Sequence, residues 1–578
     1  MKATIYHRPK SEDAYAYDKS TMHIRLRTGK NYVQKVNLIY GDPYDWVKKQ
    51  WVTSKKEMTP TGSDAQHDFW FVEVTPPYRR LRYGFEIITK TETIYYGESG
   101  FLDTPSKDTS DYFCFPFMNS ADLFSPPEWV KDTVWYQIFP ERFANGDPSR
   151  NPEGTLPWGS AAPTPTNHFG GDLQGIIDHL DYLQELGING IYLTPIFEAF
   201  SNHKYDTIDY VKVDPHFGNK ATFKRLVDEC HKRGIRIMLD AVFNHAGFYF
   251  PPFQDVLKNQ QHSKYRDWFH LRDFPVRAEE PPNYDTFAFT PFMPKFNTEN
   301  EKVREYLLNV ATYWIKEFDI DGWRLDVANE VDHAFWREFR KRVKALKPDL
   351  YILGEVWHNS LPWLAGDQFD AVMNYPLTNA IIDFAGKQKI GKQQFEHVIT
   401  QLMHMYPIHV QQVAFNLLGS HDTPRILTQT NHDVARVKLQ FLLLFSQRGT
   451  PCIYYGDEIG MTGEQDPGCR KCMIWEEEEQ NQELLSFVKS LIQLRKQEKA
   501  FGTEGDLTFV ENDSSLLIYQ KTYENQQLLF VINSTDQPDS VQLPVSWTNR
   551  DANDLLTGET LSLTTEIGIP AKSAMVLK

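Results

Sequence analysis

Apolar and polar residues alternate over short stretches in the N-terminal part of the chain. Runs of this kind occupy 22–26, 36–40, 69–74, 83–88 and 93–96, and turn-forming residues separate them. A period of two is that of a strand with one buried face, and short strands at this spacing are typical of a sandwich. We therefore predict a β-sandwich over residues 1–122, which ends where prolines break regular structure.

The pattern changes after Thr133, where strand-like runs alternate with helical periodicity. Ile176, Leu180 and Leu183, for example, recur at helical spacing between the first two runs. Strands that alternate with helices form parallel sheets, and eight units favour a closed (β/α)8 TIM barrel over an open doubly wound sheet. The eight runs lie at 134–139, 188–196, 235–239, 322–327, 350–354, 369–373, 413–418 and 451–455.

Two further segments depart from this alternation. Residues 246–297 have little periodicity and are rich in Pro, Phe and Tyr, and loops this long inside a compact domain are usually functional. We expect an inserted domain there, after the third barrel strand, which leaves 123–245 and 298–499 for the barrel. Strand-like runs return near the end, so we predict a C-terminal antiparallel β-domain over 500–578 and a multidomain α/β chain.

Composition and charge limit the classes of partner. The chain has 578 residues, 41% hydrophobic and 14% aromatic, and a formal net charge of -16. An acidic surface argues against nucleic acid or an anionic membrane as partner, and no apolar run is long enough to span a bilayer. The N-terminus lacks the apolar segment of a signal peptide. Since the five cysteines are odd in number and scattered, we expect reduced thiols and a cytoplasmic location.

The stretch from Gly322 to Glu330 places two charged groups on an otherwise apolar strand. Arg324 and Asp326 stand two residues apart and so share one face, with apolar residues between and around them. A carboxylate and a guanidinium are costly to bury unless they are paired or functional. From this stretch alone, a structural ion pair and a catalytic pair are equally good interpretations.

Polar residues also follow three other predicted barrel strands. The third strand ends in the run 240–245, the fifth in 354–358 and the seventh in 419–422. Residues at the C-terminal ends of barrel strands converge on one site. A strand-end carboxylate alone is often a helix cap, but four such ends in a chain rich in aromatic residues are hard to explain as caps. We therefore expect a catalytic site at this end of the barrel.

Two carboxyl groups in different environments are what glycoside hydrolysis requires. Arg324 would keep the Asp326 carboxyl ionised, and Glu355, beside Val356 and Trp357, is expected to have a pKa raised by desolvation. A retaining mechanism would place these two carboxyl groups about 5–5.5 Å apart. Sugar hydroxyls could be held in the oxocarbenium-like transition state by three further groups, Asp422, His245 and His421.

The four runs at the strand ends, taken in chain order, resemble sequence regions of the α-amylase superfamily of glycoside hydrolases. The resemblance covers the barrel and both flanking domains. It implies that Asp326 is the nucleophile, Glu355 the general acid/base and Asp422 the stabiliser of the transition state. It also implies sugar contacts from a second set of residues, namely Tyr205, Asp206, His245, Arg324 and His421.

The run from Met293 to Asn297 narrows this resemblance. It is similar to the fifth sequence region of the neopullulanase, cyclomaltodextrinase and maltogenic amylase group, with Phe296 in place of that group's Leu. The N-terminal β-module resembles the group's starch-binding-type module, which implies a homodimer in which this module packs on the partner's barrel and narrows the active site. The group also implies sugar-subsite roles for Phe287, Trp357, Tyr375, Asp466 and Arg470.

The same resemblance implies a structural Ca²⁺ site. Oxygen ligands from Asn, Asp and backbone carbonyls suit this ion, and the implied ligands are Asn145, Asp147, Arg150, Asn151, Gly170 and Asp172. Arg150 stands where relatives often have Asn, so its backbone carbonyl would be the ligand and its charge could weaken or abolish the site. The alternative is a turn rich in Asn, Asp and Gly.

Together these observations predict a retaining hydrolase of α-1,4-glucosidic bonds in cyclodextrins, pullulan, maltooligosaccharides and starch. It would release mainly maltose, with panose from pullulan and some transglycosylation. An ordinary α-amylase or an oligo-1,6-glucosidase is the alternative among enzymes, and the fifth region and N-terminal module disfavour both. A non-catalytic glucan-binding protein on the same fold is the remaining alternative; it would be free to lose Asp326 or Glu355, and both are present.

Overall fold

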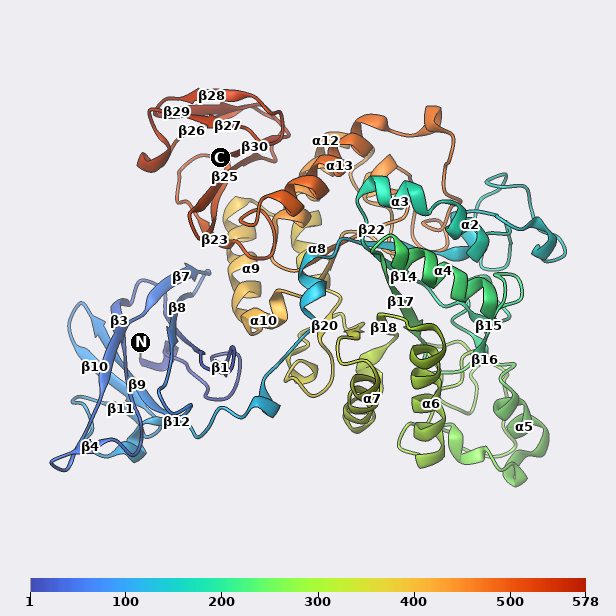
Figure 1. The fold of residues 1–578 in the computed structure, drawn as a ribbon, viewed down its shortest axis with the longest axis horizontal. Helices are drawn as coiled ribbons and strands as arrows, with labels where there is room; N and C mark the ends of the chain where they lie inside the picture. The colour runs from blue at the N-terminus through green and yellow to red at the C-terminus, as the bar shows by residue number, and fades with distance from the viewer. Residues whose placement is uncertain (1) are drawn as a thin grey trace.

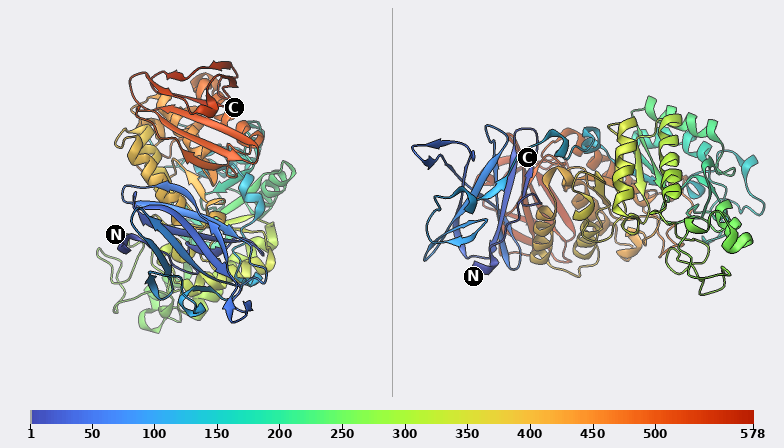
Figure 2. Two further views of the ribbon diagram at one scale, coloured as in Figure 1. Left: turned by 90° about the vertical axis from the view of Figure 1, so that its left-hand side faces the viewer. Right: turned by 90° about the horizontal axis from the view of Figure 1, so that it is seen from below.

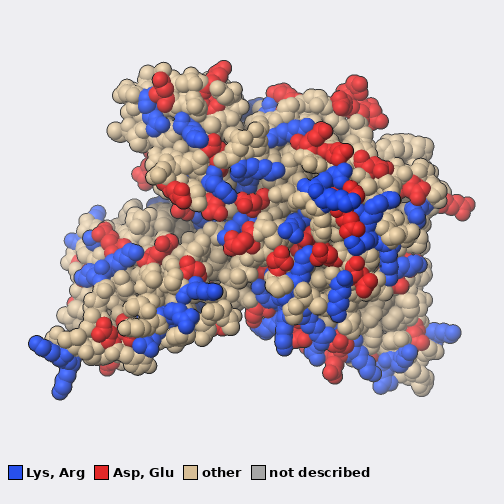
Figure 3. All heavy atoms as spheres, in the orientation of Figure 1, with Lys and Arg blue, Asp and Glu red and all other residues tan. Residues whose placement is uncertain are grey.

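The computed structural model describes residues 2–578. They form an N-terminal β-module, a barrel with an inserted segment, and a C-terminal β-domain that lies on the barrel (Figure 1). Acidic and basic side chains are intermingled over the visible face (Figure 3). Within residues 2–578, every helix is too short or too polar to cross a membrane.

The N-terminal module consists of two antiparallel sheets that share one core, which confirms the predicted sandwich. The alternating residues Met22, Ile24 and Leu26 are buried between the sheets. The first sheet runs β1 (Ala14–Ala16), β2 (Met22–Gly29), β8 (His67–Val74) and β7 (Thr59–Ser63). The second runs β11 (Gly100–Leu102), β10 (Thr93–Gly97), β9 (Leu81–Thr89), β3 (Val33–Gly41) and β6 (Ser54–Glu57), with β12 (Phe113–Phe115) beside β9.

All eight predicted barrel strands are present and parallel. A backbone bridge between Met373 and Phe415 joins β20 to β21, the two ends of the sheet order β20-β19-β18-β17-β14-β13-β22-β21, and so closes the barrel. The strands are β13 (Trp135–Ile138), β14 (Gly190–Leu193), β17 (Arg236–Ala241), β18 (Gly322–Leu325), β19 (Tyr351–Gly354), β20 (Ala371–Val372), β21 (Phe415–Leu417) and β22 (Thr450–Tyr454).

Helices surround the barrel, and polar side chains cap their first turns (Figure 1). Asn219, Asn300 and Asp332 each accept a hydrogen bond from a backbone N–H of the helix that follows, which satisfies donors that the helix itself leaves free. The main helices are α2 (Leu173–Asp178), α3 (Leu180–Leu186), α4 (Lys220–Lys232), α6 (Glu301–Phe318), α7 (His333–Leu346), α8 (Tyr375–Ile381), α9 (Lys392–Met405), α10 (Ile408–Gln411), α12 (Val434–Ser446) and α13 (Gln482–Gln497).

Two excursions leave the barrel near the ends of its strands. After β14 the chain forms a hairpin, β15 (Phe197–Ala199) and β16 (Thr207–Val213), which the sequence pattern did not reveal. The segment 246–297 contains α5 (Pro251–Asn259), two short 3-10 helices, η6 (Gln260–His262) and η7 (Arg266–Trp268), and several isolated backbone bridges. One of these bridges pairs His245 with Lys295, so this segment returns to the strand end from which it departs and encloses that side of the site.

The C-terminal domain is attached to the barrel through a buried lysine. Lys521 lies on β24 (Leu517–Tyr523) and is 1% exposed. Its Nζ donates to the carbonyl of Ser446 at the end of α12 and to those of Phe501 and Gly502, at 2.5–2.8 Å. The domain's sheet also contains β23 (Asp506–Phe509), β25 (Gln526–Asn533) and β30 (Ser573–Leu577), and Figure 2 shows it stacked beside the N-terminal module.

The N-terminal module contacts α9 and α10 of the barrel through aromatic rings and histidines. His404 stacks on Phe69 with ring centres 4.1 Å apart, and His409 lies 5.2 Å from Tyr15. His23 stacks on Tyr17 nearby. Burial lowers the pKa of each of His23, His404 and His409 to about 3, and Arg25 adds to the effect.

We predict that acid loosens this interface. The folded protein holds these histidines neutral, whereas the unfolded chain protonates them near pH 6.5. Their contribution to stability is therefore fully present above about pH 6.5 and is lost as the pH falls toward about 3. Lowering the pH from about 7 to about 5 should lower the free energy of unfolding by roughly 1–2 kcal/mol per histidine. The Tm should fall accordingly.

Calorimetry of His404→Gln tests this, because glutamine keeps hydrogen bonding and cannot be protonated. The variant should lose less stability on acidification than the wild type does. His432→Gln, at an exposed position, is the matched control and should keep the wild-type slope. An equal slope in all three proteins would contradict the prediction.

Candidate active site

Three carboxyl groups meet one guanidinium at the ends of neighbouring barrel strands. Asp240 lies on β17 and Arg324 on β18, while Asp326 and Glu355 follow β18 and β19 directly. Arg324 Nη1 lies 2.7 Å from Asp326 Oδ1 and 3.1 Å from both Asp240 oxygens. Its Nη2 lies 2.8 Å from Glu355 Oε1. The predicted nucleophile and acid therefore contact the same cation.

This cluster is largely buried, and Asp326 and Glu355 face a cavity. Asp326 and Glu355 are 6% exposed and Arg324 is 0% exposed. Burial raises the pKa of Asp326 well above its usual range, and Arg324 opposes that rise; burial also raises the pKa of Asp240 to about 6. Because one cation lies among three carboxyl groups, the protonation of each carboxyl group depends on that of the others. We expected Arg324 to keep Asp326 ionised, and Arg324 does lower the pKa of this carboxyl group. Burial, which raises the pKa, was not included in that expectation.

Val327 links the two catalytic positions through a strained backbone. Its φ of 46° and ψ of 41° lie in the left-handed region, which a β-branched residue rarely adopts and which costs about 1–3 kcal/mol. In this conformation its N–H donates to Glu355 Oε2 at 3.0 Å. Trp357 Nε1 donates to the other oxygen at 3.3 Å. The Glu355 carboxyl is thus held from both sides, facing the cavity.

The opposite wall is built around Arg470, in the loop after β22. Its Nη2 donates to Asp422 Oδ1 at 3.2 Å, and its Nη1 lies 2.9 Å from Asp466 Oδ1. Its Nε also donates to the backbone carbonyl of His421 at 2.8 Å. Burial raises the pKa of Asp422 and Arg470 opposes the rise. Asp422, Asp466 and Arg470 therefore form one connected group.

A cavity of about 490 Å³ lies between these walls. Two pairs of stacked rings flank it: Trp357 on Tyr375 at 3.6 Å, and Phe287 on His245 at 5.1 Å. Flat apolar faces of this kind suit the faces of sugar rings. The cavity is lined by Pro165, His203, Tyr205, His245, Phe287, Met293, Asp326, Val327, Asn329, Glu330, Glu355, Trp357, His421, Asp422, Asp466 and Arg470.

Three predicted site residues lie outside this lining. Arg324 lies beneath the carboxyl groups, and Tyr375 lies behind Trp357. Asp206 lies in the loop beside Tyr205, and its carboxylate accepts hydrogen bonds from the backbone and side chain of Ser201. These contacts engage the Asp206 carboxylate within its own loop, and they hold that loop, which carries Tyr205, in place.

Other residues of the site were not among the predicted ones. Asp240 accepts from Tyr192 and Tyr205 at 2.6 and 2.9 Å, and its place at a strand end was the signal that could have identified it. Lys295 donates to Glu330 Oε2 at 2.7 Å at the rim of the cavity. Gln137 donates to His421 at 2.8 Å. No pattern in the sequence marks this glutamine, because it lies within an ordinary buried strand.

The predicted calcium ligands lie together in the loops around η5 (Pro148–Arg150). Asn145 Oδ1 is buried and has no hydrogen-bond partner, and a Cβ on Gly170 would come within 2.4 Å of both Asn145 and Asn151. Asp172 accepts from the backbone N–H groups of Gly146 and Asp147. These oxygens fit a cation. Within residues 2–578 no group of three or more His, Cys, Asp and Glu residues forms a metal site, so amide and carbonyl oxygens would complete this one.

Comparison with known proteins agrees with this geometry. Residues 137–504 match the family "Alpha amylase, catalytic domain", residues 1–119 the "Alpha amylase, N-terminal ig-like domain" and residues 507–571 the "Maltogenic Amylase, C-terminal domain". A cyclomaltodextrinase of Geobacillus thermopakistaniensis (strain MAS1) is 58% identical, over 96% of this chain and 95% of that protein.

Two further relatives extend the comparison. An intracellular maltogenic amylase of Bacillus subtilis (strain 168) is 50% identical, over 94% of this chain and 92% of that protein. A solved cyclomaltodextrinase structure superposes with a TM-score of 0.94 at 49% identity, over 100% of both chains. The barrel, the three buried carboxyl groups and these matches show that the chain belongs to the α-amylase family of glycoside hydrolases.

Proposed function

We propose that the enzyme hydrolyses α-1,4-glucosidic bonds of cyclodextrins, pullulan, maltooligosaccharides and starch with retention of configuration. It would give mainly maltose, with panose from pullulan and some transglycosylation. One observation carries the proposal: Asp326 and Glu355 contact the same buried guanidinium at the base of a cavity flanked by aromatic rings. The names of the relatives support the choice of substrates.

With Asp326 as nucleophile and Glu355 as general acid, retention of configuration requires a two-step reaction. Asp326 Oδ attacks the anomeric carbon while Glu355 donates its proton to the departing glycosidic oxygen, which leaves a glycosyl ester and an ionised Glu355. Glu355 then takes a proton from water as the water oxygen attacks the same carbon, and Asp326 is released as a carboxylate. A sugar hydroxyl in place of water gives transglycosylation, and Asp422 is positioned to accept hydrogen bonds from sugar hydroxyls on the opposite wall.

A product assay on β-cyclodextrin, pullulan and soluble starch tests this proposal. Cyclodextrin should be opened faster than starch, with maltose as the main product. Pullulan should give panose. Asp326→Asn should keep the fold and lose hydrolysis by several orders of magnitude, since the nucleophile has no substitute.

Asp349→Asn is the matched control, because Asp349 is exposed and precedes β19, at the strand end opposite the site. It should leave all rates unchanged. Near-normal turnover by Asp326→Asn would contradict the assigned roles, and rapid cleavage of starch with cyclodextrin intact would indicate an ordinary α-amylase.

We also propose that the enzyme is a homodimer in which the N-terminal module of one chain covers the active-site rim of the other. Exposed apolar side chains gather near the hairpin β4 (Trp46–Val47) to β5 (Gln50–Trp51), where Tyr44 is 75% exposed and Trp46 is also exposed. A second exposed group lies near the cavity and includes Phe289, Phe292 and Tyr249. Exposed apolar patches of this kind are typical of interaction sites.

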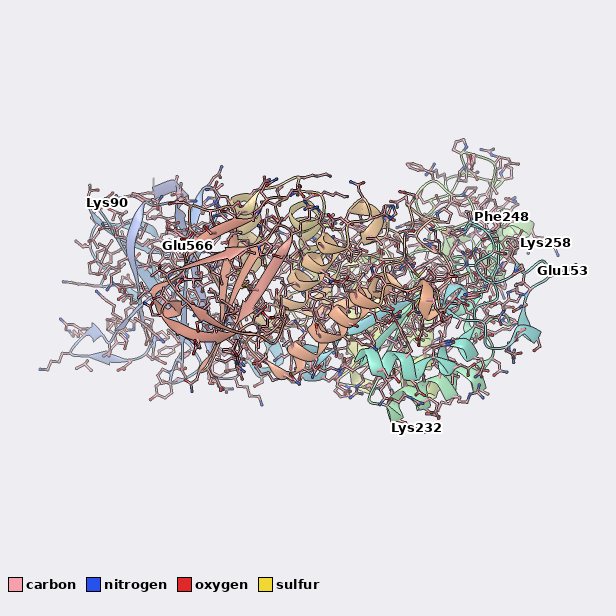
Figure 4. All side chains as sticks on the ribbon, turned by 90° about the horizontal axis from the view of Figure 1, so that it is seen from above. Lys90, Glu153, Lys232, Phe248, Lys258 and Glu566 are labelled. Atoms are coloured by element: carbon pink, nitrogen blue, oxygen red, sulfur yellow. The ribbon has the colours of Figure 1, made fainter. Side chains whose placement is uncertain are left out.

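These two patches lie at opposite ends of one chain. Figure 4 places Lys90 of the N-terminal module at one end and Phe248 and Lys258 of the inserted segment at the other. One chain therefore cannot bring its own hairpin to its own rim, whereas a second copy can. Reciprocal contacts of this kind are typical of twofold dimers.

Analytical ultracentrifugation of a Tyr44→Ala/Trp46→Ala variant tests the dimer. The wild type should sediment at twice the chain mass of 67.4 kDa, and the variant should shift toward the monomer because it loses the apolar contact. Its rate on cyclodextrin should fall several-fold relative to that on starch. Val545→Ala, at a site 91% exposed in the C-terminal domain, should change neither property. A wild type that is monomeric at all concentrations would contradict the proposal.

We propose in addition that Ca²⁺ binds at the loops around η5, held by Asn145, Asp147, Asn151, Asp172 and the carbonyls of Arg150 and Gly170. The unpartnered Asn145 Oδ1 supports this site. The Arg150 side chain opposes it, because its Nε donates to Asp147 Oδ2 at 2.9 Å and so competes with the ion. The bound ion would tie the first barrel strand to α2 and take no part in bond cleavage.

Arg150→Asn should therefore bind calcium more tightly than the wild type does. Its Tm should rise further on addition of CaCl2 and fall further in EDTA, since a ligand at about 100 times its Kd stabilises a protein by about 2.7 kcal/mol. Arg150→Lys keeps the charge and serves as the control. Absence of any calcium-dependent Tm shift in all three proteins would contradict the site itself, and equal shifts would contradict the role of Arg150.

We further propose that the enzyme acts in the cytoplasm. Its five cysteines are free, and the Bacillus subtilis relative is named as intracellular. Reduced thiols are the usual state in that compartment.

A further inference from the structure

Gln137 lies behind the active site and contacts one of its histidines. It is on β13 and is 1% exposed. Its Nε2 lies 2.8 Å from Nδ1 of His421, and it is absent from the residues that line the cavity. A buried amide that reaches a ring nitrogen can decide which nitrogen carries the proton.

The neighbours of His421 identify that proton's position. The hydroxyl of Tyr205 lies 2.9 Å from Asp240 Oδ2 and 2.8 Å from His421 Nε2. Asp240 is ion-paired with Arg324, and a carboxylate can only accept, so the tyrosine proton points to Asp240. The tyrosine oxygen must then accept from Nε2–H of the histidine. His421 Nδ1 is therefore unprotonated, and it accepts from the Gln137 amide.

We infer that Gln137 is a positioning residue, which keeps the proton of His421 on Nε2, the nitrogen that lies 3.3 Å from Asp422. The ring is also fixed from other sides. Arg470 Nε and Cys469 Sγ both donate to its backbone carbonyl, and Tyr205 stacks on it with an angle of 4° between the planes. Gln137 alone among these contacts acts on Nδ1.

The charged groups around His421 favour a neutral ring. Burial lowers its pKa well below the usual range, and Arg470 and Arg324 add to the effect. The carboxylates that face it are Asp422 directly and Asp240 through Tyr205. In a ring that stays neutral, the choice between Nδ1–H and Nε2–H determines whether the ring donates on the side of Tyr205 and Asp422 or on the side of Gln137.

Gln137→Glu tests the inference through the pH profile of kcat. At low pH the introduced carboxyl group and His421 share one extra proton. Nε2–H is present whether that proton lies on the carboxyl group or on the ring. When the pair loses it, the carboxylate draws the remaining ring proton to Nδ1 and the donor at Nε2 disappears. Activity should therefore be present at acidic pH and fall by about 100-fold as the pH rises through the pKa of the pair. The wild type should show no such additional loss.

Gln137→Met and Gln440→Met separate positioning from packing. Gln440 lies on α12, is fully buried and is not among the residues that line the cavity, so its replacement is a matched loss of a buried amide. Gln137→Met should lower kcat by about tenfold without a new ionisation, since one hydrogen bond is lost. Gln440→Met should leave kcat and its pH profile unchanged.

The ¹⁵N shifts of His421, assigned by comparison with His421→Asn, provide a readout that does not depend on activity. They should show the Nε2–H form in the wild type and the Nδ1–H form in Gln137→Glu at high pH. A wild-type pH profile for Gln137→Glu, or Nδ1–H already present in the wild type, would overturn the inference. Failure of Gln137→Glu to fold would leave the wild-type spectrum and Gln137→Met to decide it.

Discussion

The site depends on the guanidinium of Arg324, which is buried among three carboxyl groups. Taking one such ion out of water costs several kcal/mol, and only well-aligned partners repay it. Asp240 and Asp326 are such partners, since both accept hydrogen bonds from Nη1 of Arg324. Glu355 lies 2.8 Å from Nη2, but the two are not aligned for a hydrogen bond, and Nη2 has no other partner. Without the cation, the buried carboxylates would have no opposite charge to offset their desolvation. The barrel backbone must therefore keep the guanidinium and the carboxyl groups aligned.

Strand register supplies that rigidity. Asp240 and Arg324 are direct partners across β17 and β18. The N–H of Asp326 donates to the carbonyl of Ala241, and the N–H of Glu355 donates to that of Leu325. Asp326 and Glu355 are thus each the first residue beyond their strand, and each is fixed to the neighbouring strand by one hydrogen bond. A slip of one residue in any of these strands would turn the side chain to the other face.

This dependence explains which features could be predicted from the sequence. The eight strands are short buried runs with local signals, and Arg324, Asp326 and Glu355 occupy their ends, so both strands and acids were identifiable. The hairpin β15–β16 was missed because β15 has only three residues and its pairing with β16 is irregular. Gln137 was missed because its contact with His421, in the loop after β21, exists only in the folded barrel, where β22 lies between β13 and β21. The contacts of Asp206 likewise depend on how one loop folds back on itself.

The charge balance around Arg324 also changes little during the proposed reaction. In the first step Asp326 loses its negative charge as the ester forms, while Glu355 gains one as its proton leaves with the sugar oxygen. Because both carboxyl groups contact the same guanidinium, at 2.7 and 2.8 Å, Arg324 experiences nearly the same total charge before and after. A buried site cannot reorganise solvent to meet a change in charge, so a mechanism that transfers charge between two neighbours of one fixed cation avoids that cost. The same arrangement that makes the cluster stable in the resting enzyme therefore keeps it stable as the glycosyl ester forms.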